Sequence, residues 1–270
     1  MTRLLRLLAA ASAVAALWTT SALAVQGGAP DGNDHPYVGL SVFYDAAGNP
    51  LWRCSGTLVS PTVYVTAAHC AGPEYPGAPQ PASAQVWFSA DAPARGDYPG
   101  SGSCFGHIGY PCTGDATGIP AADPAWTGVL PDHDLGVVRL ATPVGGLGYA
   151  TLPPLGYLDR LSTKRGLQDT SFTIVGYGVQ VEGPNVQVAV PVRTAGSVQL
   201  QGLTDLDLKT TASPGNGTGG SAACFGDSGG PVFHGGYLVA TTSFGEKWCN
   251  GRSGSFRLDT AAAQALVTAG

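Results

Sequence analysis

Charged residues are scarce in this chain of 270 residues, because Asp, Glu, Lys and Arg together make up 11% of it, against roughly 25% in average proteins. The formal net charge is -5, which argues against nucleic acid or an anionic membrane as the main partner. Stretches with helical periodicity are also rare, whereas glycine (40) and proline (21) are plentiful. This composition is typical of short strands joined by turns, and it predicts one all-β domain of two subdomains.

Long apolar runs are absent except at the N-terminus. Within residues 1–24, two arginines precede an apolar stretch over residues 7–18, and the segment ends in Ala22-Leu23-Ala24. This order is typical of a secretory signal peptide. A transmembrane anchor is the alternative, but the apolar core is shorter than the roughly 20 residues that a span needs. We therefore expect cleavage after Ala24, a secreted, extracellular product without membrane attachment, and a folded domain over residues 25–270.

Cysteine is sparse, and six residues allow at most three disulfides. In a secreted chain an even number of cysteines indicates disulfides, although fifteen connectivities are formally possible and spacing does not select one. A zinc site is the alternative, but no CxxC or clustered Cys/His spacing supports it. We therefore predict no metal and no other cofactor. The six residues fall as three local pairs: Cys54 and Cys70, Cys104 and Cys112, Cys224 and Cys249.

Alternation of apolar and polar residues predicts the strands. A hairpin is expected from Tyr37–Tyr44 and Leu51–Val59, joined by a turn containing Gly and Pro. Residues 90–131 are rich in Gly, Pro and Asp and are expected to form long surface loops. The alanine-rich segment Thr260–Val267 predicts a short C-terminal helix. Further strands are expected at 64–66, 84–88, 135–140, 171–175, 187–192, 197–200, 231–233, 237–242 and 255–258.

Three short motifs supply the residue types that hydrolysis of an amide needs. Residues 66–70 (TAAHC) place His69 just after a strand, Asp134 opens an apolar strand, and residues 226–231 (GDSGGP) place Ser228 in a glycine-rich turn. A serine hydroxyl is a poor nucleophile without an adjacent base, and a histidine with an unperturbed pKa near 6.5 suits that task. A buried carboxylate would orient the imidazole.

The serine turn also predicts an oxyanion hole. Glycines let the backbone turn sharply, so that the N–H groups of Gly226 and Ser228 converge on one oxygen. Each motif alone is weak evidence, because a single His, a single Asp or a Gly-rich turn is usually a loop feature. Their joint occurrence in the order His, Asp, Ser, each at the edge of a strand, is the stronger signal. The remaining polar candidates are interpreted as solvent-exposed or loop residues (His35, His107, His133 and His234) or as a turn residue (Asp132).

With these motifs, the chain resembles the chymotrypsin–trypsin superfamily of serine endopeptidases over essentially all of residues 25–270. The resemblance implies two antiparallel six-stranded β-barrels, at about 25–150 and 151–270, with the active site in the cleft between them. It implies peptide-bond hydrolysis through an acyl-enzyme intermediate. Protein or peptide substrates are then the expected partners, with protein inhibitors as further candidates, and a monomer is expected.

The same resemblance implies two disulfides. Cys54–Cys70 would brace the histidine loop and Cys224–Cys249 the substrate pocket. Cys104–Cys112 has no counterpart in the family and follows by elimination. The long loop before Asp134 is a departure from the family pattern.

The resemblance also indicates where substrate would bind. It places the base of the pocket six residues before the nucleophile, at Ala222, the pocket walls at Gly245 and Gly254, and the substrate backbone along Ser243 to Gly245. No acid stands at the base to pair with Lys or Arg, whose desolvated charge would be prohibitive. We therefore expect an open apolar pocket that prefers Phe, Tyr, Leu or Met at the scissile position.

Activation is expected to follow from the new N-terminus. Val25 comes directly after the predicted cleavage site, and the resemblance implies that its α-ammonium pairs with Asp227 and orders the oxyanion loop. Removal of the signal peptide would then be sufficient for activity.

Two other functions use similar residues. A binding protein on a protease scaffold that has lost catalysis usually lacks His, Asp or Ser, and all three are present here. An esterase of the α/β-hydrolase type would match G-x-S-x-G, as residues 226–230 do. That fold runs in the order Ser, acid, His, and no acid followed by a histidine comes after Ser228.

Overall fold

A computed structural model describes most of the chain. The described residues are 25–92, 114–163, 170–183, 186–189, 192–212 and 220–269. The predicted signal peptide (1–24) and the predicted pair Cys104–Cys112 lie outside the described residues.

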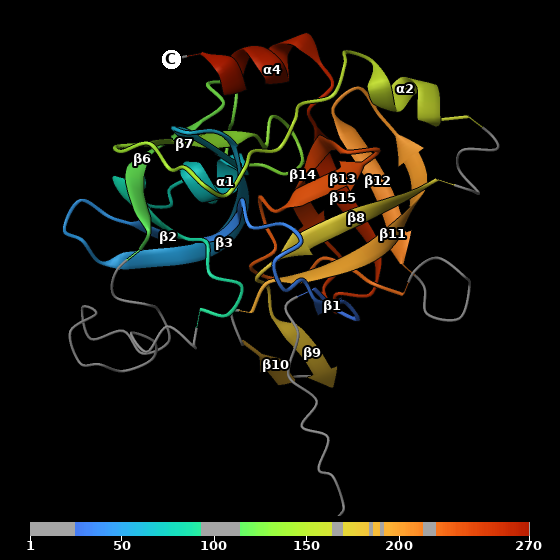
Figure 1. The fold of residues 1–270 in the computed structure, drawn as a ribbon, viewed down its shortest axis with the longest axis horizontal. Helices are drawn as coiled ribbons and strands as arrows, with labels where there is room; N and C mark the ends of the chain where they lie inside the picture. Colours follow the sequence, from blue (N-terminus) through green and yellow to red (C-terminus); the bar gives the residue numbers. More distant parts are fainter. Residues whose placement is uncertain are drawn as a thin grey trace, which may run out of the picture.

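The N-terminal half forms a closed antiparallel barrel (Figure 1). The hairpin expected from the alternating pattern is confirmed, because β2 and β3 pair with Ser41 opposite Cys54. The strand order around the barrel is β2-β3-β4-β7-β6-β5. Its strands are β2 (Val38–Tyr44), β3 (Pro50–Ser60), β4 (Val63–Thr66), β5 (Ser83–Trp87), β6 (Ala116–Ala122) and β7 (Gly136–Leu140).

The C-terminal half forms a second barrel beside the first (Figure 1). The order β11-β12-β15-β14-β13-β8 closes through the antiparallel pairing of β8 with β11. The predicted pair of six-stranded antiparallel barrels is therefore confirmed. The strands are β8 (Ser171–Gly176), β11 (Thr194–Leu203), β12 (Asp207–Ala212), β13 (Pro231–His234), β14 (Tyr237–Gly245) and β15 (Gly251–Arg257).

The first described residues lie against the second barrel, although residues 25–150 were assigned to the first from the sequence. Strand β1 (Ala29–Pro30) pairs antiparallel with β11. The N-terminal segment therefore crosses from the second barrel to the first before β2.

A separate two-stranded ribbon consists of β9 (Gln180–Gly183) and β10 (Val186–Val188).

The described residues include three short helices: α1 (Ala68–Ala71), α2 (Tyr157–Leu161) and α4 (Ala261–Thr268). The predicted C-terminal helix is α4. It begins after Thr260, whose side chain accepts a hydrogen bond from the Ala263 nitrogen, and it buries Ala263 and Val267. In the described part of the chain, every helix is too short to cross a membrane.

The expectation of surface loops over residues 90–131 is wrong where β6 forms. Strand β6 pairs with β5 and β7, and its residues alternate between buried and exposed positions. The segment consists of Ala, Gly, Pro, Thr and Ile, and most of these residues have low strand propensity. Here the pairing with two neighbouring strands overrides the local preference. Strand β12 was not predicted either.

A buried ion pair joins the two barrels. Arg193, which is fully buried, donates through Nε to Asp31 Oδ2 at 2.8 Å. Its other nitrogens donate to the carbonyl oxygens of Gly32, Val38 and Phe88 at 2.8, 3.0 and 3.1 Å. Burial alone would raise the pKa of Asp31, but hydrogen bonds from His35 and Arg193 outweigh it and hold that pKa below its usual range. This network connects the N-terminal segment to both barrels.

Candidate active site

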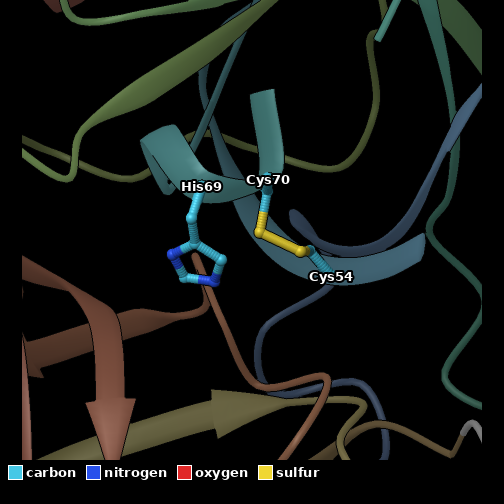
Figure 2. A group of neighbouring side chains, drawn as sticks. All are labelled: Cys54, His69 and Cys70. Carbon is cyan, nitrogen blue, oxygen red and sulfur yellow. A yellow bond between two sulfur atoms is a disulfide. The ribbon is translucent and has the colours of Figure 1, made fainter. Parts of the chain in front are cut away.

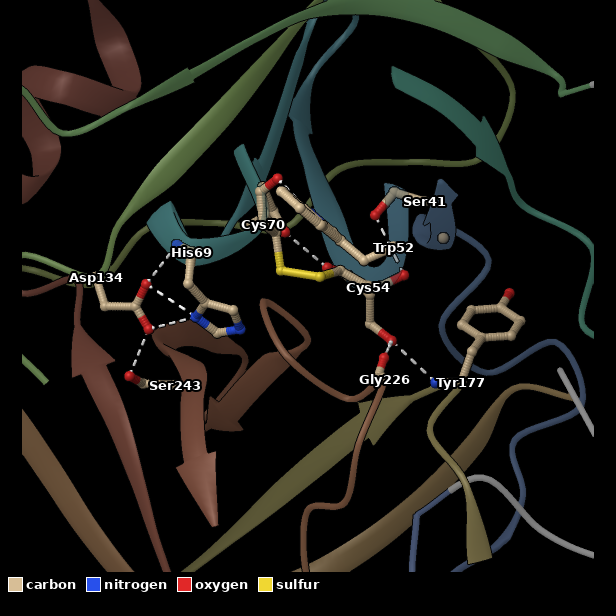
Figure 3. The surroundings of a disulfide bond; sticks show 12 residues. Ser41, Trp52, Cys54, His69, Cys70, Asp134, Tyr177, Gly226 and Ser243 are labelled. Carbon is tan, nitrogen blue, oxygen red and sulfur yellow. Dashed lines mark hydrogen bonds and ion pairs between the residues drawn. A yellow bond between two sulfur atoms is a disulfide. The ribbon is translucent and has the colours of Figure 1, made fainter. Parts of the chain in front are cut away.

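The pairing of β4 with β7 brings His69 and Asp134 together. Thr66 at the end of β4 lies opposite Gly136 at the start of β7, so the residues just beyond these two strand ends meet. His69 Nδ1 lies 2.8 Å from Asp134 Oδ2 and 3.1 Å from Oδ1, and the His69 backbone nitrogen donates to Oδ1 at 2.9 Å (Figure 3). Asp134 has no exposed surface. Its carboxylate therefore fixes the orientation of the imidazole.

Ser243 supplies a further bond to the same carboxylate. Its Oγ donates to Asp134 Oδ2 at 2.5 Å (Figure 3). From the sequence, Ser243 was expected to contact substrate, and it does line the cleft described below. Its hydroxyl, however, is directed to Asp134. The resemblance had indicated this position only for pairing with substrate backbone, so the bond to Asp134 was missed.

The electrostatic environment of His69 favours its charged form. Burial alone would lower the pKa of His69, but the charge and hydrogen bond of Asp134 outweigh it, with a smaller contribution from the charge of Glu74. The pKa of His69 therefore lies above the ordinary value of about 6.5. A histidine must be neutral to accept a proton, so a base at this position would become active as pH rises through that raised pKa.

Replacing Glu74 by Gln should move the acidic limb of the profile of kcat/KM against pH to lower pH. The change removes a negative charge that raises the pKa of His69, so the neutral imidazole persists to lower pH. The matched control is Glu246→Gln, since Glu246 also lines the cleft but is not among the groups that shift His69. Equal shifts in both variants would contradict the assignment of this limb to His69 and its neighbours.

Ser228 and His69 both line one cleft of about 510 Å³. The serine turn is held to the first barrel by the Ser55 nitrogen, which donates to the Ser228 carbonyl at 2.8 Å. Within the described residues, no hydrogen bond joins the Ser228 hydroxyl to the imidazole. Such bonds are often long in free enzymes and shorten when substrate binds.

The loop over residues 225–228, which the resemblance assigns to the oxyanion hole and which we call the oxyanion loop, has its backbone oriented by a bond to Val179. The Val179 nitrogen donates to the Phe225 carbonyl at 2.8 Å. Because C=O and N–H point in opposite directions across a trans peptide, the Gly226 N–H points away from Val179. Gly226 has φ 95°, a left-handed conformation that glycine adopts without steric cost. Neither Gly226 nor Ser228 donates its backbone N–H to another described backbone group.

Both disulfides implied by the resemblance form in the described part of the chain, Cys54–Cys70 and Cys224–Cys249. The first lies directly beside His69 (Figure 2). Cys54, His69 and Cys70 are close enough to suggest a metal site, but the two sulfur atoms are bonded to each other and offer no thiolate. The Trp52 indole nitrogen donates to the Cys70 carbonyl at 2.9 Å, which further anchors the histidine loop (Figure 3).

The four predicted substrate-binding residues separate into two groups. Ser243 and Gly245 line the cleft, whereas Ala222 and Gly254 are not among its lining residues. Ala222 is buried and forms a backbone bridge with Gln26. The Phe244 ring covers Gly254 and fills the space where a side chain would stand.

Ser253, which the sequence did not indicate and which does not line the cleft, lies opposite Gly245. Ser253 pairs with Gly245 across β14 and β15, and a Cβ added to Gly245 would lie 3.9 Å from Ser253 Oγ and 3.1 Å from the Ala223 carbonyl. Gly245, Ser253 and Ala223 therefore face one another. The cleft is also lined by the Cys224–Cys249 disulfide and by four exposed apolar side chains, Tyr75, Val129, Leu130 and Phe225.

Val25 and Asp227 are both buried, but no bond joins them in the intact chain. The Val25 nitrogen donates to Thr194 Oγ1. Asp227 accepts from the nitrogens of Gly178 and Cys224, each at 2.8 Å. The predicted pair concerns a chain that starts at Val25, and it stays a prediction.

Comparison with known proteins gives the family and the fold of the chain. A family model described as Trypsin matches residues 25–263. Among solved structures, a collagenase designated HL is 15% identical with a TM-score of 0.59, over 87% of this chain and 94% of its own. The inactivated protease paralogue S-D1 of the scabies mite is 15% identical with a TM-score of 0.56, over 87% of this chain and 92% of its own. These two likenesses show the fold alone. No curated protein matches the chain in sequence.

Proposed function

Because the chain belongs to the trypsin family and is a serine endopeptidase, we propose that His69, Asp134 and Ser228 are its catalytic residues. The observation that carries this proposal is the buried carboxylate of Asp134, which holds His69 Nδ1 at 2.8 Å on the wall of the cleft that Ser228 shares. An inactivated paralogue has the same fold, so the fold alone does not decide activity. The catalytic side chains decide it, and this chain has His69, Asp134 and Ser228.

The reaction follows from these positions. Ser228 Oγ attacks the carbonyl carbon of the scissile bond while its proton passes to His69 Nε2. Asp134 keeps the Nδ1 proton in place and stabilises the imidazolium, and the N–H groups of Gly226 and Ser228 donate to the new oxyanion. The C–N bond then breaks, and His69 returns its proton to the leaving amine. A water molecule then attacks the carbonyl carbon of the acyl-enzyme while His69 takes its proton. The ester bond to Ser228 Oγ breaks, and His69 returns the proton to Ser228.

The substrate preference that the cleft supports is a large apolar residue at the scissile position. Ala223 and Gly245 leave space, and the disulfide and Phe244 add apolar surface. Glu74 and Glu246 are the acidic residues of this lining, and both are exposed to solvent. Neither is buried at a pocket base, where an acid would have to meet a desolvated Lys or Arg.

A panel of otherwise identical peptide substrates with Phe, Ala or Arg at the scissile position tests both the peptidase activity and the apolar preference. We expect kcat/KM to be highest for Phe, because one buried aromatic side chain contributes several kcal/mol more than a methyl group. Cleavage of none of the three by the chain starting at Val25 would contradict the peptidase proposal. Fastest cleavage of the Arg substrate would contradict only the apolar preference, and Glu246→Gln would then show whether Glu246 recognises it.

Export follows from the N-terminal pattern and the disulfides. Disulfides persist in oxidising compartments, and two are formed among the described residues. We therefore place the working enzyme outside the cell, as a monomer that meets protein substrates and protein inhibitors.

A further inference from the structure

The described part of the N-terminal segment, from Val25 on, is held against the C-terminal barrel by several buried contacts. Val25 is fully buried, and its carbonyl accepts from Gln180 Nε2 at 2.6 Å. The backbones of Gln26 and Ala222 exchange two hydrogen bonds, at 3.0 and 2.9 Å. The side-chain amide of Gln26 also bonds the backbone of Val181. The position of the Val25 nitrogen is therefore set by the folded barrel.

That nitrogen meets the hydroxyl of Thr194. Thr194 is the first residue of β11, is fully buried, and accepts a hydrogen bond from the Val25 nitrogen. Its cross-strand partner is Gly176, the last residue of β8. Directly opposed residues in an antiparallel pair point their side chains to the same face, with Cβ atoms roughly 5 Å apart.

The Asp227 carboxylate occupies the side-chain position of Gly176. A Cβ at Gly176 would overlap with Asp227 Oδ1, so any larger residue there would displace the carboxylate. Asp227 Oδ1 therefore lies on the same face of the strand pair as the Thr194 side chain, and beside it. A nitrogen bonded to Thr194 Oγ1 therefore lies on the face of the strand pair that also holds Asp227 Oδ1.

Among the described residues, no cation is bonded to Asp227. Burial raises the pKa of Asp227 to about 7, against the opposing hydrogen bonds from Cys224 and Gly178 and the charge of Arg53. Within the described residues, no ion pair joins Arg53 to this carboxylate, and Arg53 Nη2 has no hydrogen-bond partner. A buried carboxylate without a cation costs free energy that an ammonium would offset.

We propose that Thr194 is a positioning residue for the new N-terminus, which it seats between its own hydroxyl and Asp227. A peptide nitrogen carries one hydrogen, and in the intact chain Val25 donates that hydrogen to Thr194. Cleavage before Val25 turns the nitrogen into an ammonium with three hydrogens, of which one stays on Thr194 and another reaches Asp227. The Thr194 hydroxyl thereby helps to hold the oxyanion loop. This inference rests on the proposed function of that loop.

The test compares chains that start at Val25 and carry Thr194→Val, which removes the hydroxyl, or Thr194→Ser, which keeps it. In Thr194→Val the ammonium loses an acceptor, so its pKa falls and the alkaline limb of kcat/KM moves to lower pH. Carbamylation of Val25 by cyanate, followed by mass spectrometry of the N-terminal peptide, should be at least about tenfold faster, because hydrogen bonds to charged groups contribute about 1.5–3 kcal/mol. Thr194→Ser should behave as the unchanged chain.

The matched control is Thr241→Val, because Thr241 is a fully buried threonine of the same barrel whose hydroxyl has no partner. It should change neither the alkaline limb nor the cyanate rate. If Thr194→Val does not fold, Thr194→Ala reports the same loss of the hydroxyl. A cyanate rate and an alkaline limb that stay unchanged on loss of the Thr194 hydroxyl would overturn the inference. The cyanate rate needs no peptidase activity, so failure of the proposed function would leave this test decisive.

Discussion

Replacing Ser228 by alanine should lower kcat for peptide hydrolysis by about a millionfold while the protein stays folded. The change removes the nucleophile, and serine peptidases that lose it retain only what the oxyanion hole and substrate binding supply. Ser228 lies in a turn held by backbone bonds from Ser55 to Ser228 and from Gly229 to Thr242. Because these bonds do not involve the hydroxyl, the variant should keep its urea midpoint.

Two measurements separate this role from a structural one. A serine-directed fluorophosphonate should label the unchanged protein at Ser228 and leave Ser228→Ala unlabelled, whereas the surface control Ser60→Ala should be labelled fully. The double variant with His69→Ala should be no slower than either single variant, because residues that act as one unit are not additive. Turnover of Ser228→Ala near that of the unchanged protein would refute the assignment.

Replacing Arg193 by methionine should lower the free energy of unfolding by about 3–5 kcal/mol, because it leaves Asp31 as a buried charge without its partner. Arg193 and the Asp31 side chain have no exposed surface, so water cannot replace the lost bonds. The carbonyl oxygens of Gly32, Val38 and Phe88 would also lose donors. Urea unfolding monitored by tryptophan fluorescence measures the loss.

The control for this variant is Arg252→Met, at an exposed position of β15, where substitutions usually change stability by no more than about 0.5 kcal/mol. Adding Asp31→Asn to Arg193→Met should recover part of the loss, since it removes the uncompensated charge. A loss below about 1 kcal/mol in Arg193→Met would mean that this ion pair does not stabilise the packing of the two barrels.

The strands that sequence patterns located are those rich in β-branched, aromatic and other large apolar residues. The hairpin of β2 and β3 is an example, with a polar turn between two apolar runs. Strands β6 and β12 were missed, because β6 is built from small residues that carry little local preference. Such strands form when a barrel already offers paired neighbours on both sides, as β5 and β7 do for β6.

The positions of single side chains in the substrate pocket were also predicted only in part from the sequence. Ser243 and Gly245 were placed on the cleft from a short motif, and both line it. Gly254 was expected on a wall, but the register of β14 and β15 sets Ser253 opposite Gly245 and puts Gly254 under Phe244. A shift of one residue along a strand moves a side chain to the other face, and no local pattern in the sequence reports that register.

The sequence by itself determined the residue types that carry the chemistry and their order, because His69, Asp134 and Ser228 each lie in a short motif whose spacing is readable along the chain. It also determined the all-β class, through composition and alternation. Only the tertiary structure decided which distant groups share a bond: Ser243 with Asp134, Thr194 with the Val25 nitrogen, and Arg193 with Asp31. These contacts depend on barrel closure and strand register, which arise from packing between segments more than 100 residues apart.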